Sequence, residues 1–344
     1  MTLVVSLIIV GISSIIAILI DRSFTNKYKQ NNQVVTKQQN TFDEENRYTF
    51  MTDSESEENE NAQTSSLSDN SSQIEYLKGV KKSIIAFVIY YAFNLAGGLI
   101  FQLVLHPCVL KDLGISTEQL IYGNVLYDEA IYKMYENYLT GYLNFVIFAI
   151  VFVGLILLYK NSLLEDLKSL KSNPFKVLKL AGLGFVGMYV ANFLVSFIIL
   201  MFFGDDFIST NQSGLNDLFN AGGDIRILLI IFTVIFAPIV EELLFRKSLF
   251  NFFKKNSGAA IIVSALIFAG IHVLTPTLSA LIGFITKENE FNLVIQEFLY
   301  IIVYLAPAFV LSFVYSMSEK NLLPCILMHM TQNLLSVIFM FIDL

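Results

Sequence analysis

The sequence has few charged residues and few cysteines for its length. Only 15% of the 344 residues are charged, whereas 55% are apolar and 31 are phenylalanine. A soluble core of this length cannot bury so many apolar side chains. The composition, with a mean hydropathy of +0.63, therefore excludes a soluble globular domain and indicates an integral membrane protein.

Further absences narrow the possible functions. The chain has no internal repeat, no glycine-rich phosphate loop and no nucleic-acid-binding motif, so nucleic acid is not an expected partner. The two cysteines, Cys108 and Cys325, fall on opposite sides of the membrane in the topology argued below. We therefore expect no disulfide between them.

Long apolar runs set the fold class. One bilayer crossing requires about 20 mostly apolar residues, and the sequence contains several such runs. They span residues 3–20, 83–105, 142–159, 177–203, 226–248, 258–275, 293–317 and 322–343. The sequence therefore predicts an all-α fold, a polytopic membrane helix bundle of about eight transmembrane helices.

The amino-terminal quarter of the chain differs from the rest. Residues 1–20 contain an apolar run with no charged residue ahead of it and basic residues after it, which favours an uncleaved transmembrane anchor over a secretory signal. Residues 21–77 are polar and acidic, with almost nothing to bury, and are predicted to form a disordered cytosolic linker. Residues 78–225 are predicted to supply accessory transmembrane helices.

The distribution of lysine and arginine predicts the orientation, because cytosolic loops of membrane proteins carry an excess of both. Basic residues gather before the second predicted crossing, after the third and after the fifth. They are Lys78, Lys81 and Lys82; Lys160, Lys168, Lys171, Lys176 and Lys179; and Arg246, Lys247, Lys254 and Lys255. The loop 160–176 is thus expected in the cytosol and 206–222 outside, with Glu241 near the cytosolic end of its helix.

The run FTVIFAPIVEELLFRKSLF places ionisable residues inside a predicted crossing. Each such group costs roughly 2.5 to 3.5 kcal/mol at membrane depth on insertion scales, so the cluster requires compensation or a function. Only Glu242 lies four residues from Arg246, the helical spacing at which a carboxylate and a guanidinium meet. We predict a structural Glu242–Arg246 ion pair, which leaves Glu241 free, and Pro238 loosens the turn before it.

Other polar side chains lie in the later crossings. His272 occurs in IFAGIHVL, four residues after Phe268, whose ring can separate the imidazole from lipid. His329 and Asn333 are also four apart, so they share one helical face and can point at the same atom. We expect these groups and Glu241 to form one site.

These residue types suit peptide hydrolysis. A carboxylate in a partly desolvated pocket beside an imidazole can hold and deprotonate a water molecule. An imidazole and a carboxamide on one helical face can stabilise the oxyanion that forms when the water attacks a carbonyl group. The sequence therefore predicts Glu241 as general base, His272 as its orienting or proton-sharing partner, and His329 with Asn333 as oxyanion donors.

Three motifs resemble one known family. EELLFR (Glu241 to Arg246), FAGIH (Phe268 to His272) and HMTQN (His329 to Asn333) are similar to the EExxxR, FxxxH and HxxxN motifs of the CPBP family. This family, also called Abi, contains CAAX-type prenyl-protein endopeptidases and bacteriocin-processing proteases. The resemblance covers roughly residues 226–343 and implies that Glu241 and His272 activate water while His329 and Asn333 bind the oxyanion. Residues 226–344 are accordingly the predicted catalytic core, with Glu242, Arg246 and Phe268 in structural support.

Alternatives remain open at this stage. A non-catalytic membrane scaffold or bacteriocin-immunity-type partner could keep the same fold, and a transporter is a more distant possibility. No cofactor is expected, although Glu241, His272 and His329 would match a catalytic zinc set if a metal were present; the chain lacks the HExxH helix of many zinc proteases. The expected partners are the lipid bilayer and a peptide or membrane-protein substrate, which could be a prenylated tail, a leader or a signalling peptide.

Overall fold

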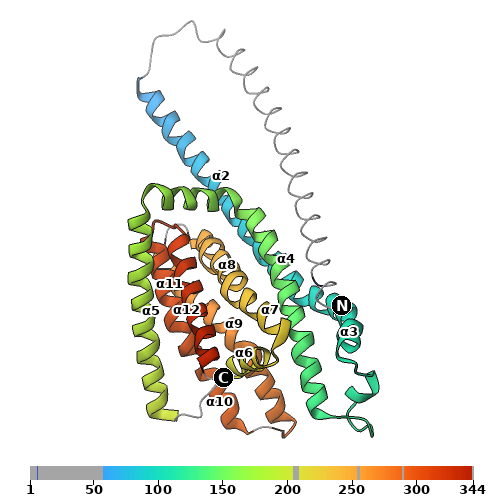
Figure 1. Ribbon diagram of the computed structural model, residues 1–344. Helices are drawn as coiled ribbons and strands as arrows, with labels where there is room; N and C mark the ends of the chain where they lie inside the picture. Colours follow the sequence, from blue (N-terminus) through green and yellow to red (C-terminus); the bar gives the residue numbers. More distant parts are fainter. Residues whose placement is uncertain (1–5, 7–56, 204–208, 254–255, 289, 343–344) are drawn as a thin grey trace.

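The computed structural model describes residue 6 and residues 57–203, 209–253, 256–288 and 290–342. Within these residues every regular element is a helix (Figure 1), which confirms the predicted all-α fold. The longer helices are α2 (Glu57–Ala92), α3 (Gly98–Leu113), α4 (Glu129–Ser172), α5 (Pro174–Phe203), α6 (Thr210–Asn220), α7 (Gly223–Ile231), α9 (Ser257–Ile285), α10 (Phe291–Leu299), α11 (Ile301–Met317) and α12 (Leu323–Ile342). Short turns of other helical types, η1 (Phe93–Gly97), η2 (Thr117–Leu120) and η5 (Asn251–Phe253), lie between them.

Seven helical stretches of the described residues are long and apolar enough to cross a membrane. They are Gln73–Leu113, Glu129–Ser172, Pro174–Met201, Gly223–Phe253, Ser257–Ile285, Phe291–Met317 and Leu323–Ile342. Each contains or closely matches one of the crossings predicted after residue 77, so the protein is a multi-pass integral membrane protein. The other predicted crossing, 3–20, lies outside the described residues except for Ser6.

The helices extend beyond the apolar runs that predicted them. Helix α2 begins at Glu57, so its first turns lie in the part of 21–77 that was assigned to the linker; residues 21–56 lie outside the described residues. Helix α4 continues to Ser172, and α5 begins at Pro174, so most of the expected loop 160–176 is helical. Hydropathy marks the part of a helix inside the bilayer, whereas the helix itself ends where its backbone hydrogen bonds end.

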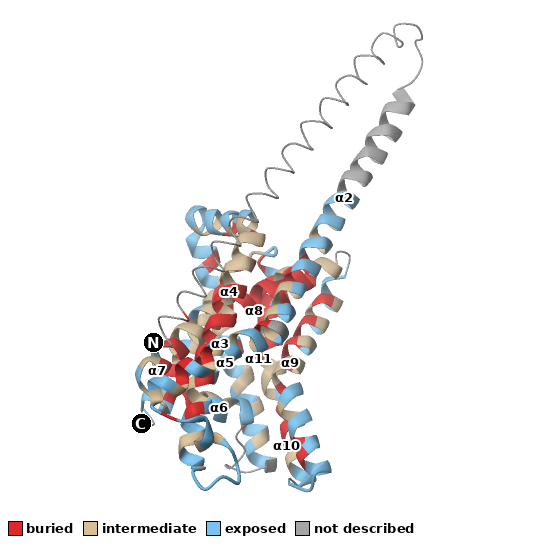
Figure 2. Cartoon of the chain, turned by 90° about the vertical axis from the view of Figure 1, so that its right-hand side faces the viewer, coloured by how far each residue is buried: buried red, intermediate tan, exposed pale blue. Residues whose placement is uncertain are grey.

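Burial follows the arrangement of the helices. In Figure 1, α5 lies along one flank of the bundle and α3 and α4 lie toward the opposite flank, with α8 (Ala237–Glu241), α9, α11 and α12 between them. Buried residues gather along α4 and α8 (Figure 2). By contrast, α5 exposes large apolar side chains such as Phe193 and Phe197, which in a membrane face lipid.

The helix that carries the two glutamates is irregular along its length. After α7 it continues as a π-helical turn, η3 (Phe232–Phe236), then as α8 (Ala237–Glu241) and as a second π-helical segment, η4 (Glu242–Ser248). The N–H of Ala237 donates to the Phe232 carbonyl, and Pro238 has no N–H to donate. The helix that contains Thr233 therefore has no N–H that donates to the Thr233 carbonyl. This free carbonyl is bound by another helix at the site.

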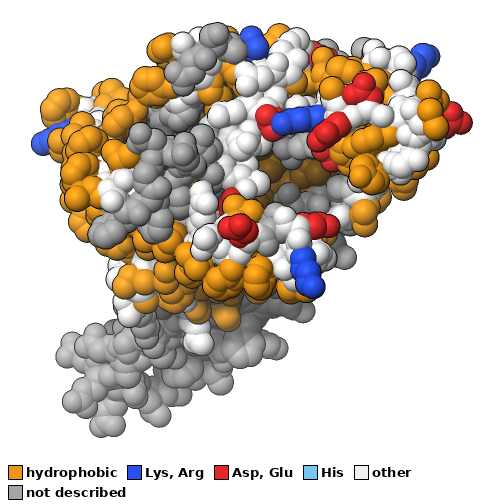
Figure 3. All heavy atoms as spheres, turned by 90° about the horizontal axis from the view of Figure 1, so that it is seen from below, with side chains coloured by type: hydrophobic (Ala, Val, Ile, Leu, Met, Phe, Trp, Pro, Cys, Tyr) orange, Lys and Arg blue, Asp and Glu red, His pale blue; other side chains and the backbone are white. Residues whose placement is uncertain are grey.

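Two short helices, α6 and α10, lie at the end of the bundle shown at the bottom of Figure 1. The Ser209 side chain caps α6 by accepting a hydrogen bond from the Gln212 N–H at 3.1 Å. Seen from this end (Figure 3), charged side chains lie on the face and hydrophobic side chains along its margin. That distribution fits an end of the bundle that meets water, with a rim that meets lipid.

Candidate active site

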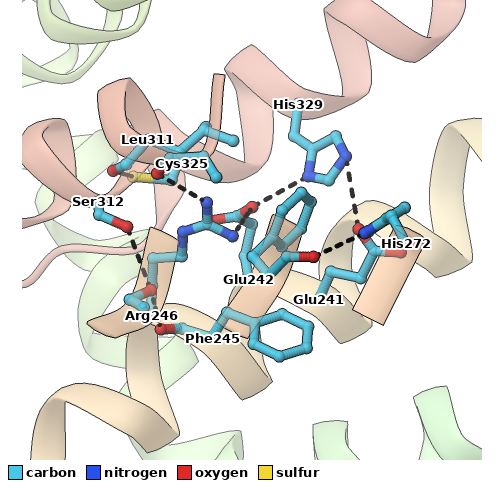
Figure 4. A network of polar contacts seen from close by, with 12 residues as sticks. Glu241, Glu242, Phe245, Arg246, His272, Leu311, Ser312, Cys325 and His329 are labelled. Atoms are coloured by element: carbon cyan, nitrogen blue, oxygen red, sulfur yellow. Dashed lines mark hydrogen bonds and ion pairs between the residues drawn. The ribbon is translucent and has the colours of Figure 1, made fainter. Parts of the chain in front are cut away.

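Glu242 and Arg246 form the ion pair that their spacing predicts. Arg246 Nη1 donates to Glu242 Oε1 at 3.0 Å, and both side chains are 0% exposed. The guanidinium also donates from Nη2 to the Ala308 carbonyl of α11 at 3.2 Å and lies 4.7 Å from the centre of the Phe268 ring. These contacts hold η4 against α9 and α11 (Figure 4).

His329 lies between the two glutamates. Its Nδ1 is 2.9 Å from Glu242 Oε1 and its Nε2 is 3.7 Å from Glu241 Oε2. An ionised carboxylate can only accept, so Nδ1 carries a proton and donates to Glu242. The 3.7 Å separation from Glu241 is longer than a hydrogen bond. Glu241, Glu242, Arg246 and His329 thus form a buried group, here called the carboxylate–histidine cluster.

His272 is fixed by its own helix and by aromatic rings. Its Nδ1 lies 2.8 Å from the Phe268 carbonyl oxygen, which can only accept, so Nδ1 carries the proton in this contact. The imidazole packs against the Phe268 ring at 4.6 Å and the Tyr304 ring at 4.6 Å, measured between ring centres. This arrangement leaves Nε2 as the nitrogen that is available to other groups.

Asn333 binds the carbonyl that the irregular helix leaves open. Its Nδ2 donates to the Thr233 carbonyl oxygen at 2.7 Å. Pro238 and the π-helical turn η3 deprive that oxygen of a donor from its own helix. A carboxamide nitrogen has two hydrogens, so Asn333 keeps one for another acceptor.

The structure brings the predicted site residues together in a different pairing from the expected one. Glu241 was expected to contact His272, yet in the described part of the chain no hydrogen bond or ion pair joins them, and the imidazole nearest to Glu241 is that of His329. Phe268 was expected to shield His272, and it contacts His272, His329 and Arg246. The catalytic roles assigned to these residues stay predictions.

Some residues around the site had no distinctive sequence signal. Ser264 donates to the Phe245 carbonyl at 2.6 Å, and Ser312 donates to Ser264 Oγ at 3.1 Å. Cys325 lies 3.3 Å from the Leu311 carbonyl. Single serines and cysteines in apolar helices are common, so only the packing of α9, α11 and α12 against η4 identifies them as support for the site.

The alternative zinc set is not assembled here. Among the residues that the structure describes, no three His, Cys, Asp or Glu side chains are grouped closely enough to hold a metal ion. His272 and His329 each use Nδ1 for another contact, to the Phe268 carbonyl and to Glu242, which leaves Nε2 of each ring as the nitrogen that a metal would use. The metal-free chemistry and the zinc alternative both stay predictions.

The fold and this geometry define a polytopic membrane protein with a buried glutamate–histidine site. Residues 223–335 match the family described as type II CAAX prenyl endopeptidase Rce1-like. The chain thus carries an Rce1-like domain of the CPBP/Abi type, and the family is one of membrane-integral peptidases. The matched region begins at the first residue of α7 and contains every predicted site residue.

One curated relative adds to this comparison. An uncharacterized protein of Mycoplasma capricolum subsp. capricolum is 30% identical over 200 residues, which cover 55% of this chain and 53% of that protein. The chain therefore spans about half the length of the curated relative it matches. No solved structure matches the chain.

Proposed function

We propose that the protein is an intramembrane endopeptidase that hydrolyses a peptide bond by attack of a water molecule activated by Glu241. The buried carboxylate–histidine cluster, inside a domain of a peptidase family, carries the proposal. A membrane protein gains little in stability from a second buried carboxylate such as Glu241, because burial of a charge is costly.

Glu241 is suited to the role of general base. Its side chain is 11% exposed, and the neighbouring Glu242 accepts hydrogen bonds from Arg246 and His329 through Oε1. Glu241 takes a proton from the water as the water oxygen bonds to the carbonyl carbon of the substrate. When the C–N bond breaks, the same proton passes to the leaving amine nitrogen, and the second water proton remains on the new carboxyl group, so the products are a carboxylic acid and an amine.

His329 and Asn333 supply the donors for the oxyanion. Nδ1–H of His329 is bound to Glu242, so Nε2 donates only when the ring carries two protons. A doubly protonated ring makes the cluster neutral, because two carboxylates then face two cations. The second Nδ2–H of Asn333 is the other donor, while the first is held by the Thr233 carbonyl.

His272 orients the water. With its Nδ1–H bound to the Phe268 carbonyl, the lone pair on Nε2 can accept a hydrogen bond from the second water proton. In this scheme the imidazole holds the water for Glu241 rather than bonding to the carboxylate itself.

Because the matched family is one of peptidases, the substrate is expected to be a peptide. Because the site lies within a bundle of membrane helices, that peptide is expected to be associated with the membrane. A prenylated tail and a leader peptide both fit this chemistry. The positive-inside rule places the reaction near the cytosolic face.

The proposal can be tested on whole cells and on purified protein. Mass spectrometry of membrane peptides compares cells that make the natural protein with cells that make Glu241→Gln, which keeps the shape of the side chain but removes the base. Purified, chelator-treated protein is then assayed on a fluorogenic peptide, with elemental analysis for zinc. Glu290→Gln, a change of an exposed glutamate, is the matched control.

We expect cleavage by the natural protein and by Glu290→Gln after chelation, and none by Glu241→Gln. Removal of a general base typically lowers the rate by about 100- to 10,000-fold. Identical peptide profiles in all strains would favour the non-catalytic scaffold. Activity that disappears with bound zinc and returns only on its addition would replace the metal-free mechanism.

A further inference from the structure

The orientation of His272 depends on more than its own helix. The hydrogen bond from Nδ1 to the Phe268 carbonyl is local, because both residues belong to α9. Rotation of the ring by half a turn would exchange the nitrogen with a carbon and lose this bond. His272 is only partly buried, so something besides close packing must hold the plane of the ring.

Tyr304, in the first turns of α11, supplies that restraint. Its ring stacks on the imidazole with 4.6 Å between centres and an angle of 23° between the planes. Near-parallel stacking restricts both the tilt of the imidazole and its rotation. Tyr304 lies within the matched domain but belongs to none of the three sequence motifs.

The hydroxyl group of Tyr304 is itself held from another helix. Asn211 Nδ2, at the start of α6, donates to the Tyr304 hydroxyl oxygen at 2.9 Å. The preceding residue, Thr210, donates through its backbone N–H and its hydroxyl to Glu297 Oε1. Glu297 is 3% exposed and belongs to α10, so two adjacent residues of α6 bind the α10–α11 segment.

We infer that Tyr304 is a positioning residue for His272, and this inference rests on the proposed function. The tyrosine ring keeps the imidazole in the orientation that places the proton on Nδ1 and the lone pair on Nε2. The contact with Asn211 fixes the position of the tyrosine ring. The stacked ring is the main restraint and the hydroxyl contact a secondary one.

The chain is well suited to a direct test, because it contains only three histidines. Histidine labelled with ¹⁵N gives separate imidazole signals, and the nitrogen shifts distinguish a protonated nitrogen from one with a lone pair. The His272 signals are assigned by their absence in His272→Gln. The spectra of the natural protein in detergent, Tyr304→Phe and Tyr304→Leu are then compared.

The natural protein and Tyr304→Phe should both show His272 with its proton on Nδ1, since phenylalanine retains the ring. Tyr304→Leu should show exchange between the two tautomers. In the peptide assay Tyr304→Leu should lower kcat by about 100-fold with little change in KM, because a small misplacement of a catalytic group has an effect of that size. Tyr304→Phe should keep most of kcat.

Phe309→Leu is the matched control, since Phe309 lies on the same helix and is 47% exposed. It should change neither the His272 signals nor kcat. If Tyr304→Leu does not yield folded protein, Tyr304→Met, which fills the volume without a flat ring, replaces it.

Unchanged His272 signals in Tyr304→Leu would overturn the inference, whatever the effect on kcat. The spectra do not depend on turnover, so they decide the role of Tyr304 even if no peptide is cleaved. If the natural protein cleaves no peptide but Tyr304→Leu still changes the His272 tautomer, the proposed function is rejected. The inference that Tyr304 positions His272 is then retained.

Discussion

Glu241 and Glu242 are adjacent in the sequence but have different environments, because only Glu242 lies four residues from an arginine. Glu242 lies four residues before Arg246 and forms the ion pair, whereas Glu241 points toward His329 (Figure 4). The fully buried pair also holds His329 through Nδ1. Arg246 therefore acts on the site indirectly, by holding Glu242 in place beside the histidine.

Arg246→Ala should lower the amount of folded protein much more than Glu241→Gln. Removal of one partner of a buried pair leaves the other charge uncompensated and typically costs about 3 to 5 kcal/mol. The measurement is the yield of monodisperse protein in detergent and its thermal midpoint. Arg226→Ala, which removes a half-buried arginine from α7, is the control and should cost less.

Equal losses in Arg246→Ala and Glu241→Gln would contradict this division between a structural and a catalytic carboxylate. The sequence could predict the Glu242–Arg246 pair because helical spacing alone determines it. It could not predict that His329 bonds to Glu242, since that contact depends on how α12 packs against η4.

At the level of helical elements, the irregular stretch from η3 to η4 connects Pro238 to Asn333, the proposed oxyanion donor. Pro238 has no backbone N–H, and the N–H of Ala237 donates to the Phe232 carbonyl in the π-helical turn. The Thr233 carbonyl therefore accepts its hydrogen bond from Asn333 of α12. π-Helical turns inside α-helices are frequent at functional sites. The sequence showed that Pro238 would loosen the helix, but not which carbonyl it frees or what binds there.

Pro238→Ala should lower kcat at least about tenfold while protein yield stays close to that of the natural protein. The new N–H at position 238 can donate to the Thr233 carbonyl and compete with Asn333. The loss should be smaller than for Asn333→Ala, because removal of an oxyanion donor typically costs about 100- to 1,000-fold. Steady-state kinetics on the fluorogenic peptide measures both.

Pro107→Ala is the control for the loss of a proline inside a helix, since Pro107 lies within α3, outside the matched domain. It should leave kcat unchanged. If Pro238→Ala retains full kcat, Asn333 does not depend on the carbonyl that the proline frees.

For the whole molecule, hydropathy located the crossings well and the helix ends poorly. The predicted crossing 258–275 corresponds to α9, which continues to Ile285. The short helix α6 was not predicted, because it is mostly polar and too short to cross a membrane. Helix α10 lies almost entirely within the predicted crossing 293–317, which the structure divides into α10 and α11. The contacts of α6 with Tyr304 and with Glu297 of α10 arise only in the folded chain, which explains why the sequence motifs did not include this part of the site.

The orientation in the membrane is the prediction on which access to the site depends. Lysine is frequent along the end of α4 and the start of α5, whereas α6 and the residues before it carry acid. The positive-inside rule therefore places the α4–α5 connection in the cytosol and α6 outside. A substrate that reaches Glu241 from the cytosol would then meet the end of the bundle opposite to α6.

Single cysteines can test this orientation, because Cys108 and Cys325 are buried and should react slowly. Ser172→Cys and Ser213→Cys each place a thiol at an exposed position, at the end of α4 and in α6. In intact cells an impermeant thiol reagent should label Ser213→Cys and not Ser172→Cys, and both should be labelled after the membrane is opened. The reverse pattern would place the α4–α5 connection outside, and a substrate would then have to approach the site from the outer face.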